Sequence, residues 1–203
     1  MMADFLCFIT RIISGLNVRW HGCLPEHTQR VYFANHTSHL DFMVLWAALP
    51  KRLRKKTRAV AAQDYWNGTK LRRYIAHHVI QAILIDRKNI SVHNTEENPV
   101  NKMLEALDEG SSLIIFPEGS RNILPEMRPF KSGLYHLVKK RPDIEYIPVY
   151  LENLSRILPK GECIFIPLLG SATLGSPLKL NKDETKNEFL ERAKKSVEEL
   201  RCS

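Results

Sequence analysis

The chain has 203 residues, a length that suits one domain with a substantial core. Its apolar content of 44% and charged content of 26% exclude an intrinsically disordered protein and fit a soluble or peripheral globular one. The net charge of +8 indicates an acidic partner: nucleic acid, an anionic membrane surface, an acidic carrier protein or a phosphorylated small molecule.

The first 22 residues have the pattern of an amphipathic helix. Apolar side chains recur at helical spacing, Arg11 and Arg19 interrupt them, and Trp20 follows. No run of about eighteen uncharged apolar residues occurs, which argues against a spanning helix. We therefore expect an N-terminal amphipathic helix at 1–22 that lies in a membrane interface, and a second unit at 23–203. The alternative is that this apolar face packs on the protein's own core.

The stretch that follows carries a candidate base. An aromatic and β-branched run predicts a strand at 30–34, and a second apolar run predicts a helix at 37–49. His36 and Asp41 can face each other only if His36 lies in the turn and Asp41 in the first turns of the helix. Asp41 would then accept a hydrogen bond from Nδ1 of His36 and leave Nε2 free to take a proton. Alone, this spacing is also typical of surface polarity or a helix cap.

A dense basic run at 51–58 comes next. It is either a solvated loop or an anchor on an anionic membrane, where each charge adds about 1 kcal/mol. We expect no nucleic acid, because neither an aromatic stacking platform nor a recognisable motif accompanies the charge. The scattered cysteines lack zinc spacing and no cleavable secretory pattern is present, so we expect reduced thiols and no metal.

The middle of the chain alternates strands and helices. We predict strands at 58–62 and 79–85 with a helix at 70–78 between them. Arg87 follows the second strand and can direct two N–H groups onto a phosphate, although an ordinary surface ion pair is the alternative. A helix at 98–110 has clear start and stop signals.

The strand predicted at 112–116 ends in a second polar turn. Gly119 lets the backbone come close to a ligand, and Arg121 can pair with a phosphate. Glu118 would hold an acceptor hydroxyl or orient an arginine. Lys131 adds positive charge before the next helix, predicted at 134–140.

The last third of the chain predicts strands at 144–151 and 163–169 and a helix at 184–201. The alternation of elements along the whole chain predicts an α/β single domain, in which helices flank a mixed, mostly parallel β-sheet. The polar turns would then share one edge of that sheet, where ligands bind in such folds.

Four stretches, in order and spacing, resemble the motifs of the glycerophospholipid acyltransferases, the family of 1-acylglycerol-3-phosphate acyltransferase. They are the stretch from His36 to Asp41, Ile83-Leu84-Ile85-Asp86-Arg87, Phe116-Pro117-Glu118-Gly119-Ser120-Arg121 and Ile147-Pro148-Val149. The second departs from the family pattern, which has glycine where this chain has Gln81 and usually phenylalanine in place of Leu84. These departures leave the acyl-chain or acceptor preference open.

The resemblance implies transfer of an acyl group from a thioester to the hydroxyl of a lysophospholipid, foremost 1-acylglycerol 3-phosphate. His36 would be the general base, steadied by Asp41. The residues implied to bind the acceptor phosphate are Arg87, Glu118, Gly119, Arg121 and Lys131, and Pro148 would help to shape the acyl pocket. The co-substrate would be acyl-CoA or acyl carrier protein, whose acidic groups the 51–58 run could also meet, and no further cofactor is expected. The protein would act on the cytoplasmic side of a membrane, as a peripheral or monotopic protein.

Two other functions use the same residues. An esterase or thioesterase would activate water with the His36 and Asp41 pair. A non-catalytic phospholipid-binding module would keep the fold, but it has no need of an oriented base.

Overall fold

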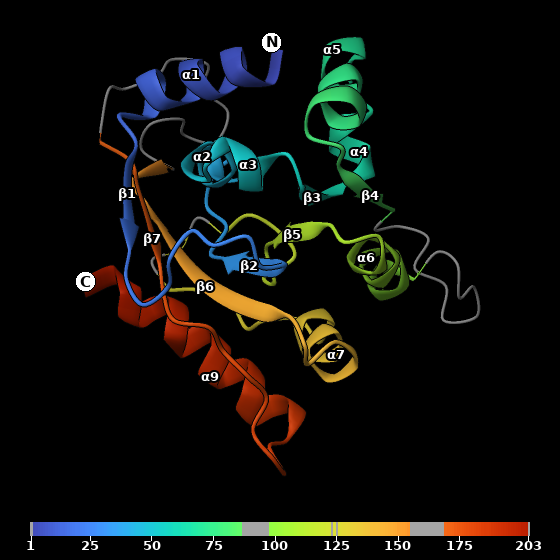
Figure 1. Cartoon of the computed structure of the whole chain (residues 1–203), viewed down its shortest axis with the longest axis vertical. Helices are drawn as coiled ribbons and strands as arrows, with labels where there is room; N and C mark the ends of the chain where they lie inside the picture. The colour runs from blue at the N-terminus through green and yellow to red at the C-terminus, as the bar shows by residue number, and fades with distance from the viewer. Residues whose placement is uncertain (1, 87–97, 123, 125, 155–168, 203) are drawn as a thin grey trace.

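A seven-stranded sheet in the order β1-β7-β6-β2-β5-β3-β4 forms the centre of the computed structural model, which describes residues 2–86, 98–122, 124, 126–154 and 169–202 (Figure 1). Within these ranges only β6 and β7 pair antiparallel, and the other neighbours are parallel. The strands are β1 (Asn17–Trp20), β2 (Arg30–Ala34), β3 (Thr57–Ala62), β4 (Ile83–Ile85), β5 (Ser112–Ile115), β6 (Glu145–Glu152) and β7 (Ser171–Leu174). The α/β fold with a mixed, mostly parallel sheet is therefore confirmed.

Helices cover both faces of the sheet (Figure 1). They are α1 (Met2–Ser14), α2 (Asp41–Ala48), α3 (Lys51–Arg54), α4 (Gln63–Trp66), α5 (Lys70–Tyr74), α6 (Pro99–Asp108), α7 (Gly133–Lys140) and α9 (Lys186–Glu199), with a π-helix η1 (Ile75–Val79) and a 3-10 helix η2 (Leu200–Cys202). Because side chains alternate along a strand, Tyr32 joins the core under α2, whereas Val31 and Phe33 join the core under α6, α7 and α9. Burial on both faces explains why residues 31–34 of β2 are apolar or aromatic, and the buried Arg30 at its start pairs with Glu145 at 2.7 Å.

The central strands end at the same edge of the sheet. β2 pairs with β5 so that Phe33 lies opposite Ile115, and β3 pairs parallel with β5 on its other side. The segments that follow β2, β5 and β3 therefore leave the sheet next to one another. This register brings the turn that contains His36 beside the turn that contains Glu118.

Several predicted elements differ from those observed. The strand at 30–34 is confirmed, but the helix predicted from residue 37 begins at Asp41. The strand predicted at 79–85 is only Ile83–Ile85, because the preceding residues form η1 and Gln81 has a positive φ of 47°. Strands β1 and β7 were not predicted, and residues 163–168 of the predicted strand at 163–169 lie outside the described residues.

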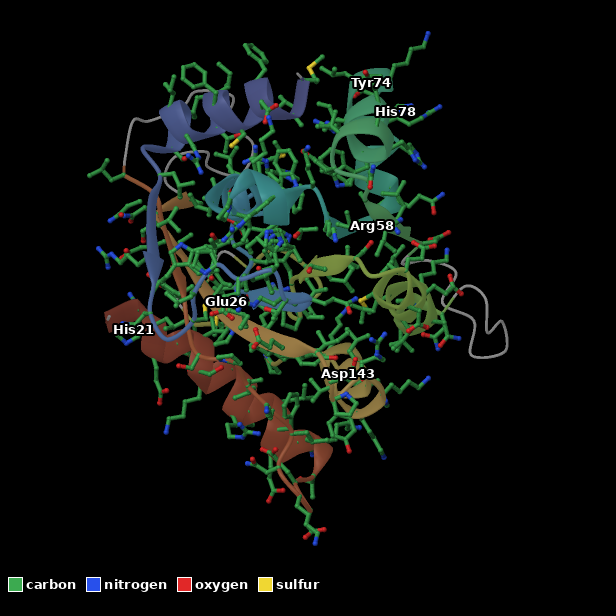
Figure 2. All side chains as sticks on the ribbon, in the orientation of Figure 1. His21, Glu26, Arg58, Tyr74, His78 and Asp143 are labelled. Carbon is green, nitrogen blue, oxygen red and sulfur yellow. The ribbon has the colours of Figure 1, made fainter. Side chains whose placement is uncertain are left out.

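The N-terminal helix α1 lies outside α2 as an additional layer (Figure 1). Arg11 donates to the carbonyl oxygen of Ala47 at 2.8 and 3.0 Å, which binds α1 to the end of α2. Phe5, Phe8 and Ile12 are 59%, 60% and 61% exposed, so these side chains do not pack on the core. Tyr74 and His78 lie at the same end of the molecule (Figure 2). None of the described helices combines the length and apolar composition that a bilayer crossing needs.

Candidate active site

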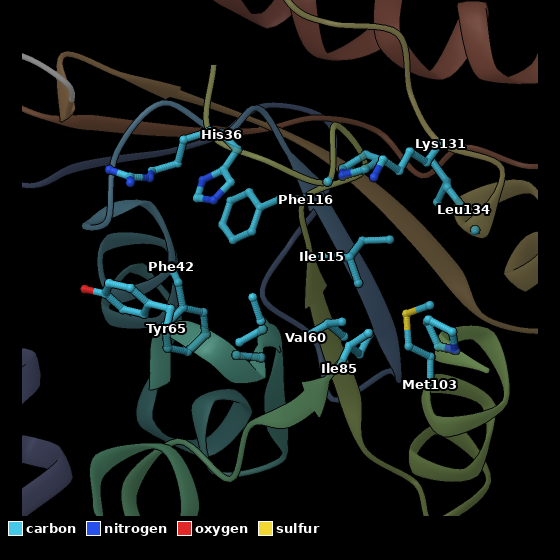
Figure 3. A pocket seen from close by; sticks show the side chains of 18 of the residues that line it. His36, Phe42, Val60, Tyr65, Ile85, Met103, Ile115, Phe116, Lys131 and Leu134 are labelled. Atoms are coloured by element: carbon cyan, nitrogen blue, oxygen red, sulfur yellow. The ribbon is translucent and has the colours of Figure 1, made fainter. Parts of the chain in front are cut away.

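A cavity of about 540 Å³ lies at the carboxyl ends of β3 and β5 and beside the turn after β2 (Figure 3). Its polar end contains His36, His39, Arg121 and Lys131. Its apolar end is lined by Val60, Ile85, Met103, Ile115 and Leu134, which come from β3, β4, α6, β5 and α7. The cavity thus has a cationic end joined to an apolar end, the shape and chemistry that an amphiphilic anion requires.

The predicted His36 and Asp41 pair is present. His36 Nδ1 lies 2.9 Å from Asp41 Oδ2, and the Asp41 side chain is fully buried. The same oxygen accepts hydrogen bonds from the main-chain N–H of Thr37 at 2.5 Å and of Ser38 at 2.8 Å. A carboxylate oxygen at this distance favours the tautomer in which Nδ1 of His36 carries the hydrogen, which leaves the lone pair of the neutral ring on Nε2. This is the orientation that a general base needs.

The main chain of His36 is held on both sides by the turn after β5. Its N–H donates to Glu118 Oε1 at 2.8 Å, and its carbonyl oxygen accepts from the N–H of Asn122 at 2.7 Å. The second oxygen of Glu118 accepts from the N–H of Arg128 at 3.1 Å. Glu118 is 4% exposed and does not line the cavity. Its carboxylate holds the main chain of His36, and its predicted role of holding an acceptor hydroxyl or orienting an arginine stays a prediction.

Two further residues of the site were not predicted. The ring of Phe116 stacks on the imidazole of His36 with centroids 4.3 Å apart and planes at 22° (Figure 3). Asn35 is buried and exchanges two hydrogen bonds with the main chain of Leu151, at 2.9 and 2.8 Å, which ties the turn to β6. The only sequence signal for either residue was its place beside a polar turn.

The cationic end is built around Gly119. Gly119 has φ +74°, and a Cβ built there would lie 2.5 Å from Lys131 Cε, so the lysine side chain crosses directly over this glycine. Lys131 also donates from its main-chain N–H to the carbonyl oxygen of Pro117 at 2.9 Å. Within the described ranges neither the Arg121 guanidinium nor the Lys131 ammonium has a hydrogen bond or an ion pair. Both cations are therefore available to an anion in the cavity.

His39 adds an aromatic wall to the same end. Its ring stacks on Tyr65 with centroids 4.3 Å apart, and the guanidinium of Arg72 lies 4.4 Å from the Tyr65 centroid. The pKa of His39 is lowered to about 4, mainly because the ring is partly buried and further because Arg121 is positively charged. His39 is thus neutral at pH 7, and the positive charges near it, those of Arg121 and Arg72, attract anions.

Two further residues were predicted to contact the substrate, Arg87 and Pro148. Arg87 lies outside the described residues, so its phosphate contact stays a prediction. Pro148 lies in β6, where its Cγ would meet a Cβ at Gly175 at 3.1 Å, and it does not line the cavity. In the part of the chain that the structure describes, no group of three or more His, Cys, Asp or Glu side chains is placed to hold a metal ion.

The fold and site define an α/β protein in which the histidine of a His–Asp pair lines a cavity together with Arg121 and Lys131. The chain belongs to the acyltransferase family, because the model of that family matches residues 16–152. It is 34% identical over 158 residues to a 1-acyl-sn-glycerol-3-phosphate acyltransferase of Limnanthes douglasii, covering 73% of this chain and 50% of that protein. It is 27% identical over 154 residues to the alpha form of that enzyme from Mus musculus, covering 75% of this chain and 51% of the relative.

A solved structure shares the fold. The 1-acyl-sn-glycerophosphate (LPA) acyltransferase PlsC of Thermotoga maritima matches with a TM-score of 0.70 and 19% identity, over 99% of this chain and 82% of that one. At this identity the likeness supports the fold alone. The chain spans about half the length of the two sequence relatives named above.

Proposed function

We propose that the protein transfers an acyl group from acyl-CoA or acyl carrier protein to the hydroxyl of a lysophospholipid, foremost 1-acylglycerol 3-phosphate. The observation that carries the proposal is that His36, paired with the buried Asp41, lines the same cavity as Arg121 and Lys131. Both sequence relatives named above are 1-acyl-sn-glycerol-3-phosphate acyltransferases, which supports this acceptor.

The reaction uses the acceptor's own hydroxyl as nucleophile. Nε2 of His36 takes the hydroxyl proton as the oxygen attacks the thioester carbonyl, because an alcohol is a poor nucleophile at neutral pH. Asp41 stabilises the imidazolium that forms. When the tetrahedral intermediate collapses, its C–S bond breaks and the leaving thiolate takes the proton back from His36. No covalent acyl-enzyme is required.

The cations orient the acceptor. Arg121 binds the phosphate and Lys131 adds a second positive charge beside it, so that the hydroxyl is held next to Nε2 of His36. The apolar end, with Val60, Met103 and Leu134, takes an alkyl chain out of water. Such an arrangement converts binding of an anionic amphiphile into orientation of its hydroxyl.

The proposed location is a membrane surface on its cytoplasmic side. Phe5, Phe8 and Ile12 form an exposed apolar stripe on α1, which suits a helix lying at the boundary between headgroups and acyl chains. The division into an interfacial helix, predicted at 1–22, and an acyltransferase unit, predicted at 23–203, is part of this proposal, with the helix limited to α1 because residues 17–20 form strand β1 of the sheet.

The test is an assay of the purified protein with lysophosphatidate and each donor type, with formation of phosphatidate and release of thiol as readouts. We expect thiol release to depend on the acceptor and to be lost in His36→Ala. Release without any acceptor would identify a thioesterase, and no release with any donor or lysolipid would favour a binding module. A panel of lysolipids with other headgroups identifies the acceptor.

A further inference from the structure

A second cleft, of about 200 Å³, lies between α1, α3 and the turn after η1. Trp46, Lys51, Arg54, Lys55 and Gln81 are among its lining residues. It also reaches Thr57 at the start of β3, whereas the catalytic cavity reaches Ala62 at the end of that strand. The catalytic cavity is lined by Ala59 to Ala62 of the same strand, so the two linings approach each other along β3 but have no residue in common.

The cleft is cationic. Lys51 is 62% exposed, Arg54 is 7% exposed and Lys55 is exposed, and the one carboxylate in the lining is Asp4. Asp4 pairs with Lys51 at 3.0 Å and with Arg54 at 3.2 Å. Three cations against one carboxylate leave a positive site that attracts an anion.

The buried arginine is fixed before any ligand arrives. Arg54 Nη1 donates to the sulfur of Cys7 at 3.0 Å and to the carbonyl oxygen of Leu49 at 3.3 Å, and its guanidinium lies 5.0 Å from the centroid of the Trp46 ring. Trp46 is 2% exposed, and its indole Nε1 is a buried donor that has no acceptor among the described residues. The oriented guanidinium of Arg54 suits the cleft to an oxyanion, and the lining residue Trp46 has a buried donor that is usually paired in folded proteins.

Gln81 gives a further indication that the cleft is used. It lines the cleft with φ 47°, a left-handed conformation that disfavours every residue with a Cβ. Glycine would adopt this conformation without strain. A strained glutamine therefore points to a use for its side-chain amide, which can donate to an anion or to its polar neighbours.

Exposed apolar side chains lie on both sides of the cleft. Phe5 and Phe8 of α1 are 59% and 60% exposed, and Leu71 and Tyr74 of α5 are 68% and 48% exposed. Figure 1 shows α1 and α5 at the same end of the molecule. A cationic cleft between apolar side chains is complementary to a phosphate headgroup whose acyl chains continue into a bilayer.

We propose that this cleft binds the phosphate headgroup of an anionic membrane phospholipid, at a site separate from the acceptor. The lipid would hold α1 and α5 on the same bilayer surface. The proposal concerns binding alone and does not require the proposed acyl transfer.

The experiment measures binding of the full chain without an acyl donor. The probes are vesicles of phosphatidylcholine with and without phosphatidylglycerol, and soluble dihexanoylphosphatidylglycerol. Lys51→Gln/Lys55→Gln is compared with Lys140→Gln/Lys182→Gln, which removes the same charge from exposed lysines of α7 and of the turn before α9. We expect the cleft pair to weaken binding of both anionic probes about 25-fold, or about fivefold for each lysine, and the matched pair to leave it nearly unchanged.

Two more variants separate the cleft from other effects. Gln81→Gly should weaken binding roughly two- to tenfold while the melting temperature is retained or rises, because the strain is relieved as the amide is lost. Arg121→Ala, which disables the catalytic cavity, should leave binding of dihexanoylphosphatidylglycerol intact.

Three results would overturn the proposal. Equal weakening by the two lysine pairs would mean diffuse attraction of the basic protein to the membrane. Binding of inorganic phosphate without binding of the soluble lipid would make the cleft a simple anion site. Displacement of the soluble lipid by coenzyme A in the wild type but not in the cleft pair would assign the cleft to the acyl donor.

Discussion

The carboxylate of Glu118 holds the main chain of His36: Oε1 accepts from the His36 N–H at 2.8 Å. The two residues come from turns after different strands, β2 and β5. Since the N–H of Asn122 donates to the carbonyl oxygen of His36 at 2.7 Å, the proposed base is fixed in position by the neighbouring turn as well as by Asp41. The proposed catalytic geometry thus depends on residues that do not touch the substrate.

Glu118→Ala should lower both turnover and stability. It leaves the N–H groups of His36 and Arg128 without their acceptor, which costs about 2 kcal/mol or more of unfolding free energy. We expect kcat to fall more than KM rises, and Glu118→Gln to retain part of both properties because one acceptor oxygen remains. Steady-state kinetics and urea denaturation measure the two effects. A raised acceptor KM with unchanged kcat and stability would instead assign the carboxylate to the substrate.

Asp41→Asn tests the charge beside the base with little change of shape. The amide oxygen can still accept from Thr37, Ser38 and His36, but the negative charge that stabilises the imidazolium is gone. We expect kcat to fall by about 10²–10⁴-fold with little change in KM. A variant with more than half of the wild-type kcat would contradict the role of Asp41.

Arg121→Ala should raise the KM for a phosphorylated acceptor about 10- to 100-fold, the value of a charge-assisted hydrogen bond. Lys131→Ala should have a smaller effect, because an ammonium cannot direct two parallel N–H groups onto a phosphate. Lys140→Ala removes an exposed charge from α7 and serves as control. If all three variants have the same acceptor KM, the phosphate binds elsewhere.

Gly119→Ala and Gly110→Ala form a matched pair. Both glycines have positive φ, of 74° and 81°, so each substitution should cost about 1–2 kcal/mol of stability. Only at Gly119 would the new Cβ meet a side chain, Lys131, since nothing lies within 4 Å at Gly110. We therefore expect only Gly119→Ala to impair acceptor binding. Equal kinetics for the two variants would show that the close approach of Lys131 is unimportant.

The titration of His39 makes stability depend on pH. Its pKa is lowered to about 4 from the ordinary 6.5, so between these values the unfolded chain binds the proton more readily than the folded one. The contribution of the neutral His39 side chain to stability is present in full above about pH 6.5 and is lost as the pH falls toward 4. Because His39 is exposed to solvent, we expect a loss on the order of 1 kcal/mol. Denaturation at pH 7 and pH 5 should show a smaller loss for His39→Gln than for the wild type.

The local sequence pattern was enough to predict many of the helices and strands. Strand β2 was predicted with its observed bounds, because a β-branched and aromatic run that stops at polar residues has few other conformations. Helix α9 was predicted within two residues at each end, and Thr185 and Glu188 form the capping box that starts it. Strand β4 was predicted too long because the π-helix η1 and the strained Gln81 have no signal in hydrophobic periodicity.

The sequence by itself determined that His36 and Asp41 face each other, since a turn followed by a helix is local geometry within six residues. Only the tertiary structure decided what surrounds them: Glu118 lies 82 positions from His36, and Phe116 and Asn122 come from the same distant turn. The pairing of β2 with β5 brings these segments together, and strand pairing is set by packing of the whole sheet, which no short motif encodes.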